Sequence, residues 1–121
     1  MSNTSYRFTL IVEAIDIIQK RLLLINKPED FIADDQGITL LDSITIRLQT
    51  IGENLNKIYK NDEETIRKLE IDPLPIINFR NIVSHEYELL DYQIIYKVCV
   101  FDLHVLKQKI QTLLSNNDET V

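Results

Sequence analysis

Hydrophobic residues between positions 37 and 60 recur at alternating steps of three and four, which is the spacing of one face of a helix. This stripe consists of Leu41, Ile44, Leu48, Ile51, Leu55 and Ile58. A regular stripe of this kind is typical of a helix that packs in a bundle. The sequence therefore predicts a long helix from about Gly37 to Lys60.

The two ends of the chain also carry helical patterns. A first helix is predicted from about Thr4 or Ser5 to Asn26, where Lys27-Pro28 ends it because proline cannot continue a helix. A last helix is predicted from Tyr92 to about Ser115, with Asp91 as its cap. It is apolar around much of its circumference, so we expect both the core and a second subunit to cover it.

Two shorter helices are predicted between these long ones. Asn61, followed three residues later by Glu64, has the pattern of an N-cap with a capping box and would start a helix over residues 62–70. The run Asp72-Pro73-Leu74-Pro75 then breaks the chain and starts another helix, which we expect to end near Leu90.

The composition agrees with an all-α domain. The chain has 121 residues with only two glycines and three prolines, which leaves few places for tight turns. We predict one all-α domain over residues 1–121, with four to five helices and a polar tail from residue 116 that frays. The one cysteine, Cys99, excludes an internal disulfide and is predicted to be buried.

We expect no metal and no cofactor, because no Cys and His cluster resembles a metal site. No run of 18 apolar residues and no leader pattern is present, so a cytoplasmic protein without a membrane segment is predicted. The net charge of −6 argues against a general nucleic-acid binder, and no DNA binding is expected. Any contact with RNA must rest on a local positive patch, on a groove between two subunits or on a partner protein.

The most informative polar residues lie in the fourth predicted helix, in the run Arg80-Asn81-Ile82-Val83-Ser84-His85-Glu86-Tyr87. Arginine presents a planar fork that suits phosphate, and histidine is the commonest general base. In an ideal helix Arg80 and His85 are about 7.5 Å apart along the axis and about 140° apart around it. Their long side chains can therefore flank one phosphate group.

The neighbours of these residues complete the candidate site. Asn81 lies one turn before His85, so it can hydrogen-bond one ring nitrogen of His85 and fix the other for catalysis. Tyr87 falls close to Arg80 on the helical wheel. Glu86 falls on the apolar side, and its role is not explained by the sequence.

A purely structural interpretation of these residues is also available. The pattern is short, and Arg80 can be a surface charge that pairs with an acid such as Glu88, while His85 packs at the edge of the core. The second histidine, His104, lies between apolar neighbours and is predicted to be a packing residue.

The motif Arg80-Asn81-x-x-x-His85-x-Tyr87 resembles the signature of the HepT family of HEPN-domain toxins. The resemblance extends over most of the chain. Ile51-Gly52-Glu53 looks like the Ile-Gly-Glu segment of that family, and Pro73-Leu74-Pro75 precedes the motif helix as expected. One departure is Asn54, which stands where the family would have alanine; the role of Glu53 is left open.

This resemblance implies an up-and-down helical bundle that forms a homodimer in which the two motif helices face each other. It also implies a metal-independent endoribonuclease toxin of a type VII-like toxin–antitoxin pair, with Arg80 and His85 as catalytic residues acting on RNA. The implied partner is an MNT-type nucleotidyltransferase antitoxin, which would silence the toxin by AMPylation of Tyr87. The alternative is a non-catalytic HEPN-like helical module that scaffolds or regulates a nucleotidyltransferase partner.

Overall fold

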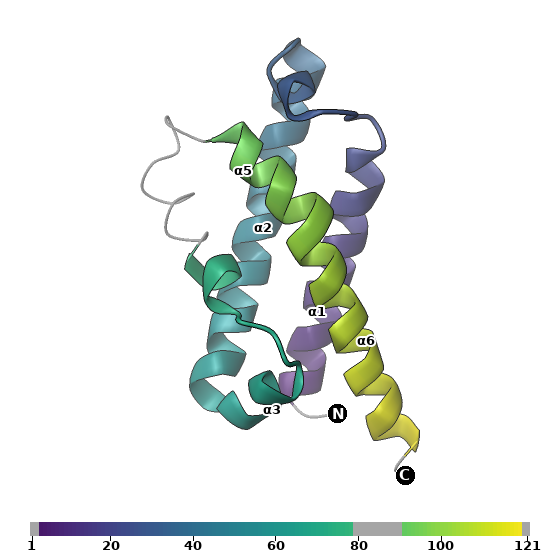
Figure 1. The fold of residues 1–121 in the computed structure, drawn as a ribbon, viewed down its shortest axis with the longest axis vertical. Coiled ribbons are helices and arrows are strands. Elements are labelled where there is room, and N and C mark those ends of the chain that lie inside the picture. The colour runs from purple at the N-terminus through teal and green to yellow at the C-terminus, as the bar shows by residue number, and fades with distance from the viewer. Residues whose placement is uncertain (1–2, 79–90, 120–121) are drawn as a thin grey trace.

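The computed structural model describes residues 3–78 and 91–119, and this part of the chain contains helices and connecting segments but no strand. The predicted all-α bundle is therefore confirmed (Figure 1). Its elements are α1 (Asn3–Leu22), the 3-10 helix η1 (Pro28–Phe31), α2 (Asp35–Asn61), α3 (Glu63–Lys68), α5 (Tyr92–Lys97), the π-helical turn η3 (Val98–Asp102) and α6 (Leu103–Glu119). Residues 74–78 are also helical.

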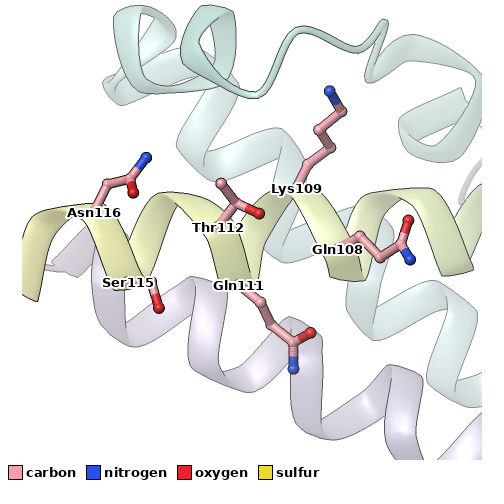
Figure 2. Close-up of a pocket in the computed structure, with 6 residues that line it drawn as sticks. All are labelled: Gln108, Lys109, Gln111, Thr112, Ser115 and Asn116. Carbon is pink, nitrogen blue, oxygen red and sulfur yellow. The ribbon is translucent and has the colours of Figure 1, made fainter.

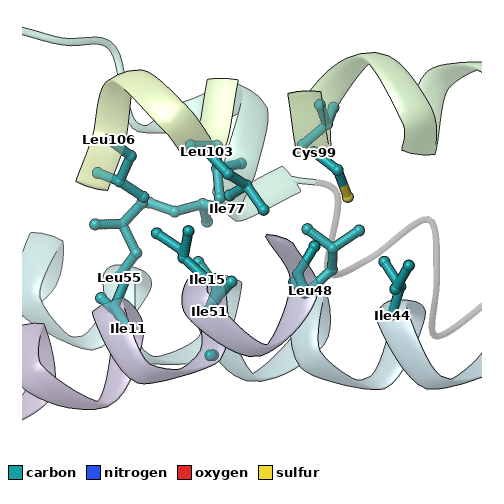
Figure 3. Close-up of a cluster of buried hydrophobic side chains, with 14 of the residues drawn as sticks. Ile11, Ile15, Ile44, Leu48, Ile51, Leu55, Ile77, Cys99, Leu103 and Leu106 are labelled. Carbon is teal, nitrogen blue, oxygen red and sulfur yellow. The ribbon is translucent and has the colours of Figure 1, made fainter. Parts of the chain in front are cut away.

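The core lies where α1, α2 and the C-terminal helix meet (Figure 3). All six residues of the predicted stripe on α2 are buried, which confirms that helix and its inward face. From α1 the core receives Phe8, Ile11, Ala14, Ile15 and Ile18. On the same helices Lys107 of α6 contacts Asp16 of α1 at 2.6 Å, so an ion pair joins the two at the edge of this core.

The last helix is continuous from α5 through η3 to α6, but the middle turn is π-helical. Its buried residues are Ile95, Val98, Cys99, Leu103, Leu106 and Ile110. The steps from Ile95 to Cys99 and from Cys99 to Leu103 are both four, and in a regular α-helix two such steps would drift by roughly 80°. A π turn is wider, so each residue advances less around the axis and all three stay on the core side.

The connection between α1 and α2 begins earlier than the sequence indicates, because α1 ends at Leu22 and not at Asn26. The chain then turns so that Ile25 is buried, while the backbone amides of Asn26 and Lys27 donate to Oδ2 of Asp30 at 2.8 and 3.3 Å. These bonds replace the helical bonds that the segment gives up, so the helix stops before Pro28.

The start of α2 packs tightly on η1. Asp34 caps the helix, and its Oδ1 accepts a hydrogen bond of 2.8 Å from the amide of Gly37. A Cβ atom at position 37 would overlap the carbonyl oxygen of Asp30 and lie 2.9 Å from that of Phe31. Glycine at this position therefore allows the two backbones to approach each other.

The junction of α2 and α3 corrects one sequence-based expectation. Asn61 is the last residue of α2, and α3 begins after Asp62, not after Asn61. Hydrogen bonds from the side chains of Thr65 and Thr4 lower the pKa of Asp62, so this carboxylate links α3 to the start of α1. α3 starts after Asp62 because Asp62 makes this contact with α1. The side-chain amide of Asn61 instead donates to the carbonyl oxygen of Lys57 within α2.

Candidate functional site

The residues that the sequence singles out for catalysis lie outside the part of the chain that the structure describes. Arg80, Asn81, His85, Glu86 and Tyr87 all fall between residues 79 and 90. Their roles therefore stay predictions, and the described residues on both sides supply the structural context.

The segment that leads into the motif begins as predicted. Asp72 accepts a hydrogen bond of 3.0 Å on Oδ1 from the amide of Leu74, and the helical residues 74–78 follow. The amide of Ile77 donates to the carbonyl oxygen of Pro73 at 3.0 Å. Ile76 and Ile77 are buried in the core, so this end of the segment is held by packing as well as by hydrogen bonds.

The segment that follows the motif is held by a cap and an aromatic contact. Asp91 is the predicted N-cap of α5, and its Oδ1 accepts from the amides of Gln93 and Ile94 at 2.9 and 3.3 Å. Tyr96 donates its hydroxyl to the carbonyl oxygen of Asn26 at 3.1 Å, and its ring meets Phe31 edge-on at 6.3 Å. The helix after the motif is thus tied to the connection between α1 and α2 (Figure 1).

The C-terminal helix exposes large apolar side chains on its outer side. Phe101 is 62% exposed, and Ile94, Val100 and Val105 are at least one-third exposed. Beside Val105 lies a hollow of about 300 Å³, which is lined by Ile71, Asp72, Pro75, Ile76, Asp102 and Val105. The core therefore covers one apolar side of the last helix, as expected, and the cover of the other side by a second subunit stays a prediction.

The Ile-Gly-Glu segment lies in α2, where Ile51 and Gly52 are buried and Glu53 is exposed. The departure at Asn54 has a structural explanation. Asn54 accepts a hydrogen bond of 3.0 Å from Arg7 of α1 and donates to the carbonyl oxygen of Thr50 at 3.0 Å. An alanine could not make the contact with Arg7, so this asparagine is a bridge between the first two helices.

The structure confirms the prediction for Cys99 and corrects the one for His104. Cys99 is buried as predicted, and desolvation raises the pKa of its thiol to about 12, so the thiol stays protonated and unreactive. His104 corrects the expectation of a packing histidine, because its side chain is exposed on α6. Leu103 and Val105 flank it in sequence, but neighbours in a helix point about 100° apart and need not share its surroundings.

A larger hollow of about 640 Å³ lies along α6, and six of its lining residues are drawn in Figure 2. They are Gln108, Lys109, Gln111, Thr112, Ser115 and Asn116. The side chains of Gln111 and Ser115 point to one side of the helix and those of Thr112 and Asn116 to the other (Figure 2). Lys109 is 3.9 Å from a carboxylate oxygen of Glu70. Because these groups do not converge on one point, this hollow is not a candidate active site.

The described residues contain no metal-binding cluster and no membrane-spanning helix. Over residues 3–78 and 91–119, no three His, Cys, Asp or Glu side chains are placed to hold a metal ion. No helix in these ranges is long and apolar enough to cross a membrane.

Comparison with known proteins gave one match. The model of a protein family described as ribonuclease HepT-like matches residues 11–113. A search of curated proteins and a search of solved structures each gave no match. The matched range contains the core stripe of α2, the Ile-Gly-Glu segment and all of residues 80–87, so it includes every residue proposed above for the site.

Proposed function

This chain belongs to the HepT-like ribonuclease family, and from that premise we propose that it is a metal-independent endoribonuclease toxin of a toxin–antitoxin pair. The observation that carries the proposal is the family match across residues 11–113, together with the intact Arg80, His85 and Tyr87 inside that range. The RNA is cut by transfer of the phosphate to a neighbouring ribose oxygen.

In the proposed reaction, His85 takes the proton from a ribose 2′-hydroxyl and the 2′-oxygen attacks the adjacent phosphorus. The bond from phosphorus to the 5′-oxygen breaks, which leaves a 2′,3′-cyclic phosphate and a 5′-hydroxyl. His85 of a second subunit supplies the proton that the leaving 5′-oxygen needs. Arg80 stabilises the negative charge that gathers on the phosphate oxygens, and Asn81 orients the ring of His85.

A homodimer through the last helix and the motif segment completes this proposal. The exposed Ile94, Phe101 and Val105 support it, because a soluble monomer seldom leaves large apolar side chains together on one surface. A second subunit over this surface removes them from water and can bring two copies of the motif together.

A nuclease assay tests the catalytic roles. The purified, unmodified protein should cleave RNA in the presence of EDTA and leave 2′,3′-cyclic phosphate ends. The variants His85→Ala and Arg80→Ala should each lose most of the activity, at least 100-fold, while staying helical. Arg67→Ala is the matched control for Arg80→Ala, because it removes an exposed arginine of α3, outside the last helix and the motif, and should keep full activity. A requirement for added metal, or full activity in His85→Ala, would contradict the mechanism.

The proposed antitoxin is a small nucleotidyltransferase of the MNT type that transfers AMP from ATP to Tyr87. The added phosphate would lie close to Arg80 and compete with RNA for it. Co-expression with such an antitoxin should add the mass of one or more AMP groups and abolish cleavage. Tyr87→Phe should escape the modification.

The other tyrosines provide the control for this modification. Tyr6 is 56% exposed on α1, so it is accessible without being near the motif in sequence. Tyr6→Phe should be modified and silenced like the wild type. Modification that persists in Tyr87→Phe, or that disappears in Tyr6→Phe, would show that the modified residue is wrongly assigned.

The acidic balance of 19 acidic against 13 basic residues favours a second candidate, because an RNA enzyme usually presents more positive charge. In this alternative the chain is a non-catalytic helical module that scaffolds or regulates the nucleotidyltransferase. Expression of the chain alone separates the two functions. Growth arrest by the wild type but not by His85→Ala supports the toxin, whereas growth without arrest in both supports the module.

A further inference from the structure

The end of the bundle that carries the connection between α1 and α2 has a protruding apolar knob. Leu23 and Leu24 follow the last residue of α1, and they are 80% and 61% exposed. Their backbone amides still donate to the carbonyl oxygens of Lys20 and Arg21 at 3.4 and 3.2 Å, so the turn that presents them is defined. In Figure 1 this connection lies at the opposite end of the molecule from both termini.

Beside the knob lies a shallow hollow between the end of α1 and the start of α2. It has a volume of about 110 Å³ and is lined by Leu24, Ile25, Asp30, Ala33, Asp34, Gln36, Gly37 and Leu40. This volume corresponds to a few water molecules, which is also the scale of one aliphatic side chain. Two of these lining residues, Asp34 and Gly37, are joined by the N-cap bond of 2.8 Å.

The charges around the knob and around the hollow have opposite signs. Lys20 and Arg21 are the basic residues in the last turn of α1, which ends one residue before Leu23. The hollow has the carboxylates of Asp30 and Asp34 in its lining, and Asp35 follows in the first turn of α2. The knob with its neighbouring basic residues is therefore complementary to the acidic hollow beside it. A two-fold axis can bring each knob to the hollow of the other copy.

We propose that this end of the bundle binds a second copy of the same chain, with Leu23 of each copy in the hollow of the other and Lys20 and Arg21 against the acidic rim. The contact is separate from the dimer through the last helix, and it does not depend on the ribonuclease function. A chain with both contacts assembles beyond a dimer, and each contact can be removed without the other.

The acidic rim makes other occupants less suitable. Carboxylates around the hollow repel the phosphates of RNA and the head groups of an anionic membrane. A helix of another protein with a basic flank would meet the same chemistry as the second copy, and the experiment below distinguishes it because only the purified chain is present.

Disulfide trapping tests the contact directly. One preparation of the full chain carries Leu23→Cys and a second preparation, with a tag of different mass, carries Ala33→Cys. After mixing and mild oxidation, the disulfide between positions 23 and 33 of two chains should be at least tenfold more abundant than in a mixture of Ile46→Cys with Ala33→Cys. Ile46 is a suitable control because it is 63% exposed on α2. The native Cys99 is buried and does not react.

Light scattering provides the second measurement. In the Phe101→Glu background, which removes the proposed contact of the last helix, the chain should still form a dimer at high concentration. Adding Leu23→Glu, which places a carboxylate opposite the acidic rim, should raise the dissociation constant at least tenfold, whereas adding Ile46→Glu should leave it unchanged. Equal trapping at positions 23 and 46, or a purely monomeric Phe101→Glu chain at every concentration, would overturn the proposal. Either result would leave the ribonuclease assignment unaffected.

Discussion

α2 and the C-terminal helix differ in how much of their apolar surface the chain itself buries. α2 has 27 residues, and its stripe from Leu41 to Ile58 is completely buried. Its exposed large apolar side chains, Ile38 and Ile46, are separated by Asp42 at the position between them. The C-terminal helix buries one side equally well but leaves Phe101 and its apolar neighbours on the other side in contact with water.

The difference shows which helix builds the monomer and which one is available to a partner. A helix with one apolar side is complete once that side packs, and α2 does so against α1. A helix with two apolar sides needs a second surface, and no described element of the chain covers Phe101. The comparison therefore predicts that substitutions in the buried stripe of α2 change folding, whereas substitutions on the outer side of the last helix change association.

The largest expected effect is a loss of folding stability when a side chain of the α2 stripe is shortened. Ile51→Ala removes a fully buried side chain from α2 and should lower the free energy of unfolding by about 2–5 kcal/mol. Phe101→Ala removes a larger side chain but should change it by less than about 0.5 kcal/mol in the monomer, because the ring is mostly exposed. Urea unfolding at concentrations where the protein is monomeric measures both. Similar losses for the two variants would mean that the outer side of the last helix already packs within one chain.

Gly37→Ala tests how closely α2 approaches η1. The added methyl group overlaps the carbonyl oxygen of Asp30, so the start of α2 must shift. We expect a loss of about 1–3 kcal/mol, although alanine is the better helix former. The neighbouring Gln36→Ala is the control and should be neutral within about 0.5 kcal/mol, because Gln36 is exposed. Urea unfolding of the two variants decides, and a stable Gly37→Ala would show that this end of α2 can relax.

Asp91→Ala compares the start of the C-terminal helix with the start of α2. Loss of the N-cap should cost about 1 kcal/mol, because the amides of Gln93 and Ile94 lose their acceptor. Asp34→Ala should cost a similar amount through the amide of Gly37. Hydrogen exchange of the backbone amides shows which helix start each substitution destabilises. We expect faster exchange at residues 93 and 94 in Asp91→Ala and at residue 37 in Asp34→Ala. Neither substitution should change the exchange of the other helix.

The smallest effect concerns pH and the attachment of α1 to α3. Hydrogen bonds lower the pKa of Asp62 below its ordinary value of 3.8, so its ionised form stabilises the fold at neutral pH and loses this effect as the pH falls through the lowered value. The wild type should therefore be slightly more stable than Asp62→Asn at pH 7, and the difference should narrow only below the ordinary pKa. Urea unfolding as a function of pH measures it. A difference that grows on acidification would have the wrong sign.

The sequence predicted those parts of the fold that depend on spacing along one helix. The stripe of α2 has regular steps of three and four, so its burial followed directly from its period. The cap at Asp91 and the start of a helix after Pro73 were also correct, because both rest on a local property of the backbone. The buried Cys99 belongs to this group as well.

The errors occur where the outcome depends on contacts between distant segments. Asn61 has a good capping pattern, but Asp62 starts α3, and its carboxylate also reaches Thr4 on α1. His104 has apolar neighbours in sequence, yet its own direction on the helix takes it to the surface. For the site, the motif indicated the HepT family together with Ile51-Gly52-Glu53 and Pro73-Leu74-Pro75, and the match over residues 11–113 confirms that family. The geometry of the motif residues stays a prediction.

The π turn of the last helix also has a consequence for insertions and deletions in this family. A single π turn contains one residue more than the α-helical turn in its place, so η3 is equivalent to a tolerated one-residue insertion. Deletion of Val100, which is partly exposed, would return the segment to a regular α-helix with both flanking helices intact. Deletion of a residue within α6 has no such compensation and would rotate every following side chain by about 100°. A relative with one residue fewer in this segment should therefore have a regular α-helix where this chain has the π turn.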